Sequence, residues 1–223
     1  MSVTNKFTLH DNMSQKSGAY LEIAIGCMYS GKTSFLVELY KQYKFCDISV
    51  AVINHLIDNR YDNEMMSTHD KVKIPCIKTD KLMDLYSEHI NINSISKDMN
   101  VYLDVPINSI PRLQDKFKVM SSEVILINEG QFFTDLEEFV KLMLVKGKKI
   151  YVSGLDGDFE RKKFGHILNL IPLCDKVTKL TSLCSLCKDG TRAIFSKRLT
   201  NETEQTVVGS DNYIPVCRSC YEK

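Results

Sequence analysis

The sequence lacks any apolar run of the about 18 residues that a membrane-spanning helix needs, and its amino terminus lacks the apolar core of a signal peptide. It also lacks a strong charge of either sign, because 29 Lys and Arg against 28 Asp and Glu give a formal net charge of +1. A near-neutral chain offers no global basic field to nucleic acid or to a membrane surface. We therefore expect a soluble cytoplasmic protein that has neither as a partner.

What the chain has is enough apolar material for a sizeable core, with 43% hydrophobic residues in a length of 223. That length fits one large domain with a small appendage. Residues 1–18 are polar and show no apolar periodicity, which predicts a flexible tail. The expected division is therefore a tail over 1–18, an α/β domain over 19–180 and a small domain over 181–223.

Residues 26–33, Gly-Cys-Met-Tyr-Ser-Gly-Lys-Thr, fit the pattern of a phosphate-binding loop. In such a loop the glycines let successive backbone N–H groups point inward toward phosphate oxygens. Lys32 then places a charge by the β- and γ-phosphates, and the Thr33 hydroxyl is a magnesium ligand. The alternative is a glycine turn that binds nothing. An expected strand over 21–25 and an expected helix over 33–45 supply the context that favours phosphate binding.

Three further apolar runs, at 49–53, 123–127 and 149–153, predict buried strands that alternate with helices, and hence a parallel sheet. A capping box formed by Thr134 and Glu137 is expected to start one of these helices. Its inward-facing residues are predicted to be Leu136, Val140, Met143 and Leu144. In the uninformative stretch 71–120 we expect a helix over 81–90 and a strand over 101–104, with Pro106 and Pro111 as breaks.

Ligands of parallel sheets bind beyond the carboxyl ends of the strands. The phosphate loop and three short polar stretches each follow an expected strand, so they should converge on one edge. These stretches contain Asp58 with Arg60, Asn128 with Glu129, and Leu155 with Asp156.

Within that predicted site, Glu129 is the candidate base, because an accepting hydroxyl must lose a proton during phosphoryl transfer. Arg60 is a candidate for neutralising the transferred group, and Asp58 for holding a magnesium-bound water. The alternative for Glu129 is a carboxylate that only favours a helix dipole. Phe132, Phe159 and Phe164 are candidates for stacking on a planar base, with core packing as the alternative for each.

Four cysteines form two Cys-x-x-Cys pairs, Cys184 with Cys187 and Cys217 with Cys220. Paired units of this kind predict a tetrahedral, structural zinc site, although the gap over 188–216 is longer than in a zinc finger. Reduced buried thiols without a metal are the alternative. The scattered cysteines are expected to be small core residues: Cys27, Cys46, Cys76 and Cys174.

A set of motifs occurs in order along the chain and resembles that of the type II thymidine kinases. The matching stretches are 26–33, Asp-x-Arg-Tyr at 58–61, Thr-His-Asp at 68–70, Glu-Gly-Gln-Phe-Phe at 129–133, Gly-Leu-Asp-Gly-Asp-Phe at 154–159, Arg-Lys-x-Phe-Gly at 161–165, Ser-Lys-Arg-Leu at 196–199 and the two cysteine pairs. The resemblance implies a RecA-like phosphate-loop domain with a zinc-bearing lasso domain. It also implies transfer of the ATP γ-phosphoryl to the 5′-hydroxyl of thymidine, and of deoxyuridine, in a homotetramer that needs Mg²⁺ and structural Zn²⁺.

The resemblance also implies roles for individual residues, with Glu129, Arg60 and Lys32 as the catalytic group. The implied ATP-binding residues are Gly26, Cys27, Met28, Tyr29, Ser30, Gly31, Lys32, Thr33, Asp58, Asn59, Arg60, Asn128, Glu129, Gly130 and Gln131. The implied thymidine-binding residues are Met28, Phe132, Leu155, Phe159, Phe164, Ser196, Gln205, Thr206, Val207, Val208, Gly209 and Tyr213. Magnesium would be held by Thr33 and, through water, by Asp58 and Asn128.

Two positions depart from the family pattern. Asn128 stands where the family usually has Asp, which removes a negative charge that would hold hydrated magnesium. We therefore expect lowered magnesium affinity and turnover. Val208-Gly209 stands where a Gly-Gly pair is common.

Two other functions stay open on the sequence. One is a nucleotide-binding relative in which Asn128 marks impaired catalysis, although the retained Lys32, Thr33, Arg60 and Glu129 argue against it. The other is a phosphate-loop ATPase whose zinc ribbon holds nucleic acid, which the near-neutral charge disfavours.

Overall fold

The computed structural model describes residues 18–58, 65–68, 70–87, 110–207 and 212–223. Several predictions of the preceding section lie outside these residues. They concern the tail up to residue 17, Asn59, Arg60, His69, the strand over 101–104, Val208 and Gly209.

A six-stranded sheet forms the centre of the molecule, in the order β5-β2-β6-β7-β1-β8. Every neighbouring pair in it is parallel, as the alternating pattern predicted. Its strands are β1 (Tyr20–Gly26), β2 (Val50–His55), β5 (Ile77–Thr79), β6 (Val124–Ile127), β7 (Lys149–Gly154) and β8 (Lys176–Leu180). The central strand β6 is buried at all four positions, which explains its unbroken run of Val, Ile and Leu.

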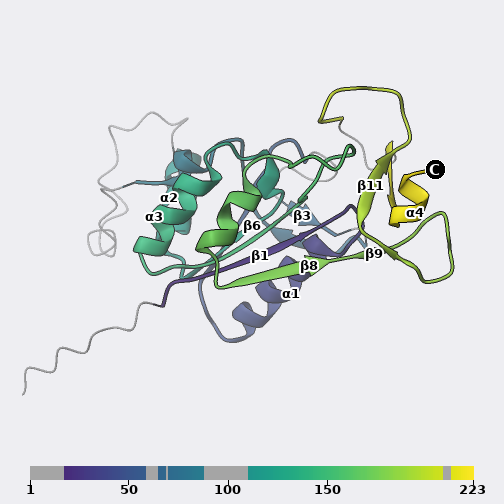
Figure 1. The fold of residues 1–223 in the computed structure, drawn as a ribbon. Helices are drawn as coiled ribbons and strands as arrows, with labels where there is room; N and C mark the ends of the chain where they lie inside the picture. Colours follow the sequence, from purple (N-terminus) through teal and green to yellow (C-terminus); the bar gives the residue numbers. More distant parts are fainter. Residues whose placement is uncertain (1–17, 59–64, 69, 88–109, 208–211) are drawn as a thin grey trace, which may run out of the picture.

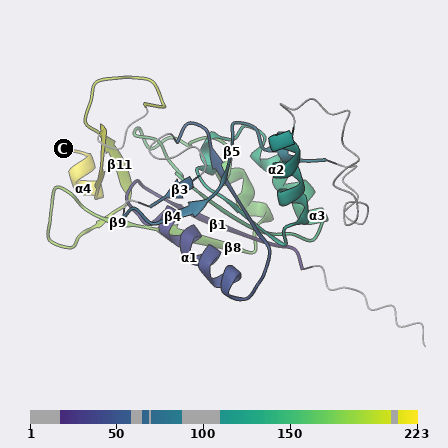
Figure 2. The ribbon, with the colours of Figure 1, turned by 180° about the vertical axis from the view of Figure 1, so that it is seen from behind.

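Helices cover both faces of this sheet (Figure 1; Figure 2). Helix α1 (Lys32–Phe45) packs on one face, where Leu36 and Val37 join a cluster with residues of β2 and β6. The other face carries α2 (Ile110–Ser121), α3 (Leu136–Val145) and the short 3₁₀ helices η1 (Leu82–Leu85) and η5 (Ile167–Leu173). None of the helices in the described residues has the length and apolarity needed to cross a bilayer.

The predicted capping box at the start of α3 is wrong. The residue at the N-cap is Asp135, and no side chain caps the helix there, because Thr134 and Asp135 form a turn before it. Asp135 instead accepts a hydrogen bond from the Met83 N–H (2.8 Å). Of the predicted inward residues, Leu136, Val140 and Met143 are fully buried and Leu144 is partly buried. Phe139, which the pattern did not predict, is also fully buried.

The stretch 71–120 differs most from expectation. Of the helix predicted over 81–90, the described residues 81–87 form only the single 3₁₀ turn η1, after which Tyr86 returns to extended backbone, and 88–90 lie outside the described residues. Helix α2 was not predicted, because Pro111 was interpreted as a break. Pro111 lies in the first turn of α2, where a backbone N–H has no helical partner and proline is tolerated. A short antiparallel pair, β3 (Met65–Ser67) with β4 (Lys73–Pro75), was also missed.

After β8 the chain builds a small region at the carboxyl ends of the sheet strands (Figure 1). It contains two antiparallel pairs, β9 (Ser182–Leu183) with β10 (Arg192–Ala193), and β11 (Phe195–Arg198) with β12 (Tyr213–Val216). The short helix α4 (Arg218–Tyr221) completes it. We call Ser182–Tyr221 the cysteine region, since it holds both cysteine pairs.

Candidate active site

One pocket lies between the carboxyl edge of the sheet and the cysteine region. Thr33, Asp58, Glu129 and Leu155 all line it, so the prediction that the stretches after four strands converge is confirmed. Asp156 is not part of the lining and pairs with Lys179 instead.

The predicted phosphate-binding loop over 26–33, below called the phosphate loop, joins β1 to α1 and uses two left-handed backbone positions, Tyr29 (φ 60°) and Gly31 (φ 85°). The ammonium group of Lys32 donates to the Cys27 carbonyl (2.6 Å) and to the Ser30 hydroxyl (3.5 Å). Lys32 therefore lies against the inside of the loop, at the N-terminus of α1. This is the position from which an ammonium group can reach a bound polyphosphate.

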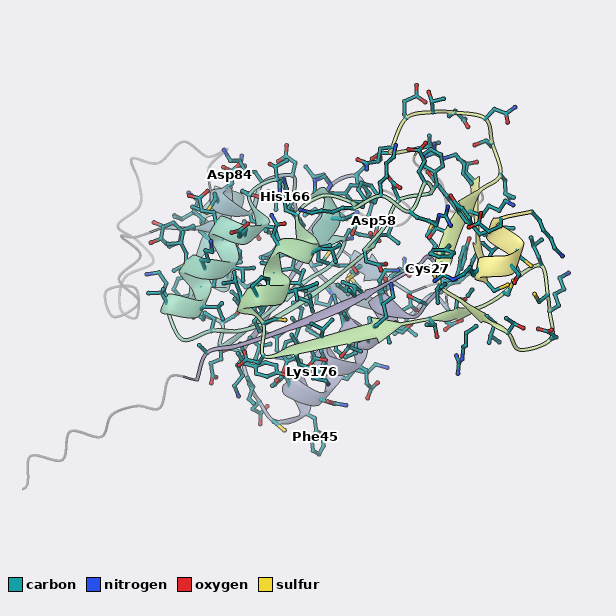
Figure 3. All side chains as sticks on the ribbon, viewed as in Figure 1. Cys27, Phe45, Asp58, Asp84, His166 and Lys176 are labelled. Atoms are coloured by element: carbon teal, nitrogen blue, oxygen red, sulfur yellow. The ribbon has the colours of Figure 1, made fainter. Side chains whose placement is uncertain are left out.

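The loop is also fixed from the cysteine region. The backbone N–H of Met28 donates to the Ser196 hydroxyl of β11 (2.9 Å). The Cys27 thiol, which is buried, donates to the Ala193 carbonyl (3.4 Å). Figure 3 shows Cys27 where β1 ends near β11. Burial raises the pKa of the Cys27 thiol, so this cysteine stays neutral and packs as a small side chain.

Glu129 follows β6 and has left-handed backbone angles (φ 55°, ψ 40°). Such a conformation costs a non-glycine residue on the order of 1–3 kcal/mol, and it persists only where the surroundings impose it. The side chain of Gln131 links the Glu129 carboxylate to the backbone that follows β7. Its Nε2 donates to the Glu129 carboxylate (2.7 Å), and its Oε1 accepts from the Leu155 N–H (2.9 Å).

Gln131 is itself held by close contact with glycine. A Cβ on Gly165, whose φ is +57°, would lie 1.9 Å from the Gln131 carbonyl oxygen. A Cβ on Gly154 would lie 2.4 Å from the Gln131 side-chain oxygen. Only glycine fits at these two positions, and this explains why both belong to the recurring motifs. The Glu129 carboxylate is therefore presented to the pocket in an orientation set by Gln131.

Asn128 lies beneath the pocket at an exposed fraction of 2% and does not line it. Its Oδ1 accepts from the Ser153 hydroxyl (2.8 Å), and its Nδ2 donates to Asn54 Oδ1 (3.1 Å). The Asn54 amide in turn donates to the Asp58 carboxylate (3.1 Å). A chain of donors thus runs from Ser153 to Asp58, whose side chain reaches the pocket.

Aromatic rings form the wall opposite the phosphate loop. Phe132 and Phe164 meet edge to face, with centroids 5.4 Å apart, and His55 packs on Phe132 at 5.5 Å. Burial lowers the pKa of His55, which favours its neutral form beside the rings. Phe132, Phe159 and Phe164 all line the pocket, so a planar base has apolar ring surface within reach.

The four paired cysteines come together in the cysteine region. Their sulfur atoms all lie within 4.8 Å of one another, with Cys187 Sγ 3.7 Å from Cys217 Sγ and 3.4 Å from Cys220 Sγ. Tetrahedral zinc with Zn–S bonds of about 2.3 Å places its sulfurs about 3.8 Å apart. The N–H groups of Cys187 and Cys217 donate to the Cys184 sulfur and lower the pKa of that thiol. Separation and donors both fit a thiolate cluster around one metal ion.

Comparison with known proteins agrees with this geometry. The sequence model of the family described as "Thymidine kinase" matches residues 19–116 and 88–221. The chain belongs to the thymidine kinase family.

Named relatives match over nearly their whole length. The thymidine kinase of Yaba monkey tumor virus (strain VR587) is 37% identical over 212 residues, which cover 95% of this chain and 98% of that protein. The thymidine kinase of Myxoma virus (strain Uriarra) is 38% identical over 206 residues, covering 92% and 97%. That of Vaccinia virus (strain Western Reserve) is 35% identical over 206 residues, covering 92% and 98%.

The pocket of this thymidine kinase family member brings together most of the residues that the sequence singled out. Those that line it are Met28, Tyr29, Ser30, Gly31, Lys32, Thr33, Asp58, Glu129, Gln131, Phe132, Leu155, Phe159, Phe164, Ser196, Gln205, Thr206, Val207 and Tyr213. Four predicted residues do not contribute to this lining as the described residues form it: Gly26, Cys27, Asn128 and Gly130.

Sequence reasoning missed four lining residues, Ser34, Ile57, Gly157 and Asp158. Asp158 is the most informative of them, because its Oδ2 accepts from the Gln205 side chain (2.7 Å). It lies in the Gly-Asp-Phe stretch after β7, within the family motif at 154–159. The sequence signal for it is a carboxylate in the polar stretch that follows the predicted strand over 149–153.

Proposed function

We propose that this chain transfers the γ-phosphoryl group of ATP to the 5′-hydroxyl of thymidine, and of deoxyuridine, to give the nucleoside monophosphate. The observation that carries the proposal is the Glu129 carboxylate, which Gln131 fixes in the same pocket as the phosphate loop. Family membership supports the same reaction.

In this proposal the phosphate loop and Lys32 bind the ATP phosphates, and Glu129 acts on the nucleoside. Glu129 accepts the proton of the 5′-hydroxyl as the O5′–Pγ bond forms and the bond from Pγ to the bridging oxygen of ADP breaks. Arg60, which lies outside the described residues, is proposed to neutralise charge on the transferred group.

The donor set in the pocket suits magnesium. The Thr33 hydroxyl and the Asp58 carboxylate are hard oxygen ligands, and both line the pocket. Mg²⁺ would be held by Thr33 directly and by Asp58 through water, and it supplies charge neutralisation at the phosphate oxygens. Asn128 would contribute through its hydrogen bonds to Asn54 and so to Asp58.

The nucleoside is proposed to lie between the aromatic wall and the segment that follows β11. Phe132 and Phe164 offer ring surface, while Leu155 and Ser196 border the base. Gln205, Thr206 and Val207 supply the outer wall. The four clustered cysteines are proposed to hold structural zinc, which fixes this side of the pocket. By resemblance to the family, we also propose a homotetramer that acts in the cytoplasm.

Steady-state phosphorylation of thymidine by ATP, across a magnesium titration, tests the proposal. Glu129→Gln should lower kcat by about 10²–10⁴-fold, which is the usual contribution of general base catalysis, while ATP binding persists. Glu138→Gln, an exposed carboxylate on α3, is the matched control and should keep wild-type activity. Saturable ATP binding without thymidine phosphorylation in the wild-type protein would identify a nucleotide-binding relative instead.

A further inference from the structure

Arg198, at the end of β11, has an exposed fraction of only 8%. A buried guanidinium group is costly unless its donors are satisfied. All three of its nitrogens donate. Nη1 bonds the carbonyls of Glu202 and Glu204 (both 2.7 Å), and Nη2 bonds the carbonyl of Gln205 (3.2 Å) and the Tyr213 hydroxyl (2.5 Å). Nε bonds the same hydroxyl (3.2 Å).

The flat face of the Arg198 guanidinium group also contacts aromatic rings. The guanidinium carbon of Arg198 lies 3.6 Å from the centroid of the Phe159 ring and 5.1 Å from that of Tyr213. Arginine combines a planar donor fork with a surface that stacks on aromatic rings. One side chain therefore fixes the backbone of residues 202–205 with its edge and an aromatic ring with its face.

The groups that Arg198 holds belong to the pocket, although Arg198 itself does not line it. Gln205, Phe159 and Tyr213 are all lining residues. Residues 201–207 form neither helix nor strand, so no ladder of backbone hydrogen bonds shapes them. The three hydrogen bonds from Arg198 to their backbone carbonyls shape this segment instead.

A second contact holds the same segment from the opposite side. The Gln205 amide donates to Asp158 Oδ2, while Asp158 Oδ1 accepts from the N–H groups of Glu160 and Lys162 (both 2.9 Å). Gln205 is thus fixed by the loop after β7 and by β11 together. Contacts within the protein thus give the segment a defined shape.

We propose that Arg198 is a positioning residue for nucleoside binding, one that pre-forms the pocket wall made by residues 202–207 and the Phe159 ring. The proposal rests on the proposed function for the identity of the substrate. A preformed wall lowers the ordering cost of binding. Loss of the fork therefore weakens nucleoside binding and leaves the ATP side, built on Lys32 and Thr33, unchanged.

The test compares Arg198→Lys and Arg198→Gln with wild type. Lysine keeps the charge but cannot form the planar fork. We expect the KM for thymidine to rise about 10-fold or more in both variants, since a misplaced binding wall costs factors of this size, while the KM for ATP stays within about twofold. Amide hydrogen exchange of residues 199–207 should accelerate, and that of β7 should not. Arg192→Gln, an exposed arginine on β10, is the control and should change neither quantity.

Hydrogen exchange in Arg198→Lys tests, independently of activity, whether Arg198 shapes residues 202–207. Unchanged exchange at 199–207 would overturn the proposal, as would an equal rise in both KM values or faster exchange throughout the sheet. If wild type fails to phosphorylate thymidine, the proposed function fails, and the exchange result still tests whether Arg198 shapes the wall.

Discussion

The parallel sheet and the cysteine region both contribute residues to the pocket, yet different forces hold them together. The sheet has an apolar cluster on each face, and strands such as β6 are completely buried between them. The cysteine region has one small cluster whose buried members are Cys184, Ala193, Val216, Cys217 and Cys220. Three of those five residues are cysteines of the proposed metal site.

This difference shows how the two walls of one pocket gain their rigidity. The free energy gained by burying apolar surface is proportional to the area buried. A large sheet can therefore hold Glu129 in a strained backbone conformation. A region as small as Ser182–Tyr221 cannot bury enough area and depends on a metal or on specific cross-links. We therefore expect the sheet and the cysteine region to unfold separately, and variants can test this.

The largest effect is expected from Cys187→Ser. A structural zinc site contributes about 10–16 kcal/mol of folding free energy, so loss of one thiolate should unfold the cysteine region. We expect loss of bound zinc, a fall in thymidine turnover of about 100-fold or more because outer elements of metal sites alone are worth 10–100-fold, and retained ATP binding. Metal content, turnover and ATP titration measure these quantities.

Cys46→Ser is the control, because Cys46 is exposed at the end of α1 and is not the core residue that the sequence predicted. It should keep both zinc and activity. A Cys187→Ser protein that binds zinc and turns over thymidine as wild type does would contradict the assigned role of the cluster.

A smaller effect in free energy is expected from Phe139→Ala in α3. Phe139 is fully buried against the sheet, and truncation of such a ring costs about 3–5 kcal/mol. Chemical denaturation followed by far-ultraviolet circular dichroism should report this loss, while zinc content stays at the wild-type level. Val145→Ala, 88% exposed at the end of the same helix, should cost little. Loss of zinc together with the sheet would show that the two regions do not fail separately.

The smallest effect is expected from Asn128→Asp. The new carboxylate should lower the magnesium concentration needed for half-maximal rate, because negative charge beneath the pocket attracts the cation. The variant also loses the donor to Asn54, and an unsatisfied buried group costs about 1–3 kcal/mol. Magnesium titration and thermal denaturation separate the two effects.

Asn201→Asp adds the same charge at an exposed position and serves as control. A magnesium dependence identical to wild type in Asn128→Asp would show that the charge at this position does not act on the metal.

The sequence predicted the sheet and the convergence of its loops because buried parallel strands need unbroken apolar runs, as in β6. It also placed Glu129 at the pocket edge of the sheet, since a residue that follows a parallel strand lies at the carboxyl edge. The sequence did not predict α2, where Pro111 was taken for a break, or β8, whose pattern Lys-Val-Thr-Lys-Leu is too polar for a buried strand.

The interior hydrogen bonds of the site were not predictable from local patterns. The chain from Ser153 through Asn128 to Asp58 joins strands β7 and β2 to the residues that follow β6 and β2. Arg198 belongs to the same class, because its partners are mainly backbone carbonyls, which leave no signature in a sequence. Such contacts depend on tertiary structure alone.

The hydrogen bond from the Met28 N–H to the Ser196 hydroxyl has a consequence for how the two substrates communicate. It joins the phosphate loop to Ser196 within β11, not to the segment that Arg198 holds, so a displacement of the strand itself alters the contact with the loop. Coupling between two binding sites is reciprocal. If a nucleoside tightens ATP binding through this bond, ATP must tighten nucleoside binding by the same factor.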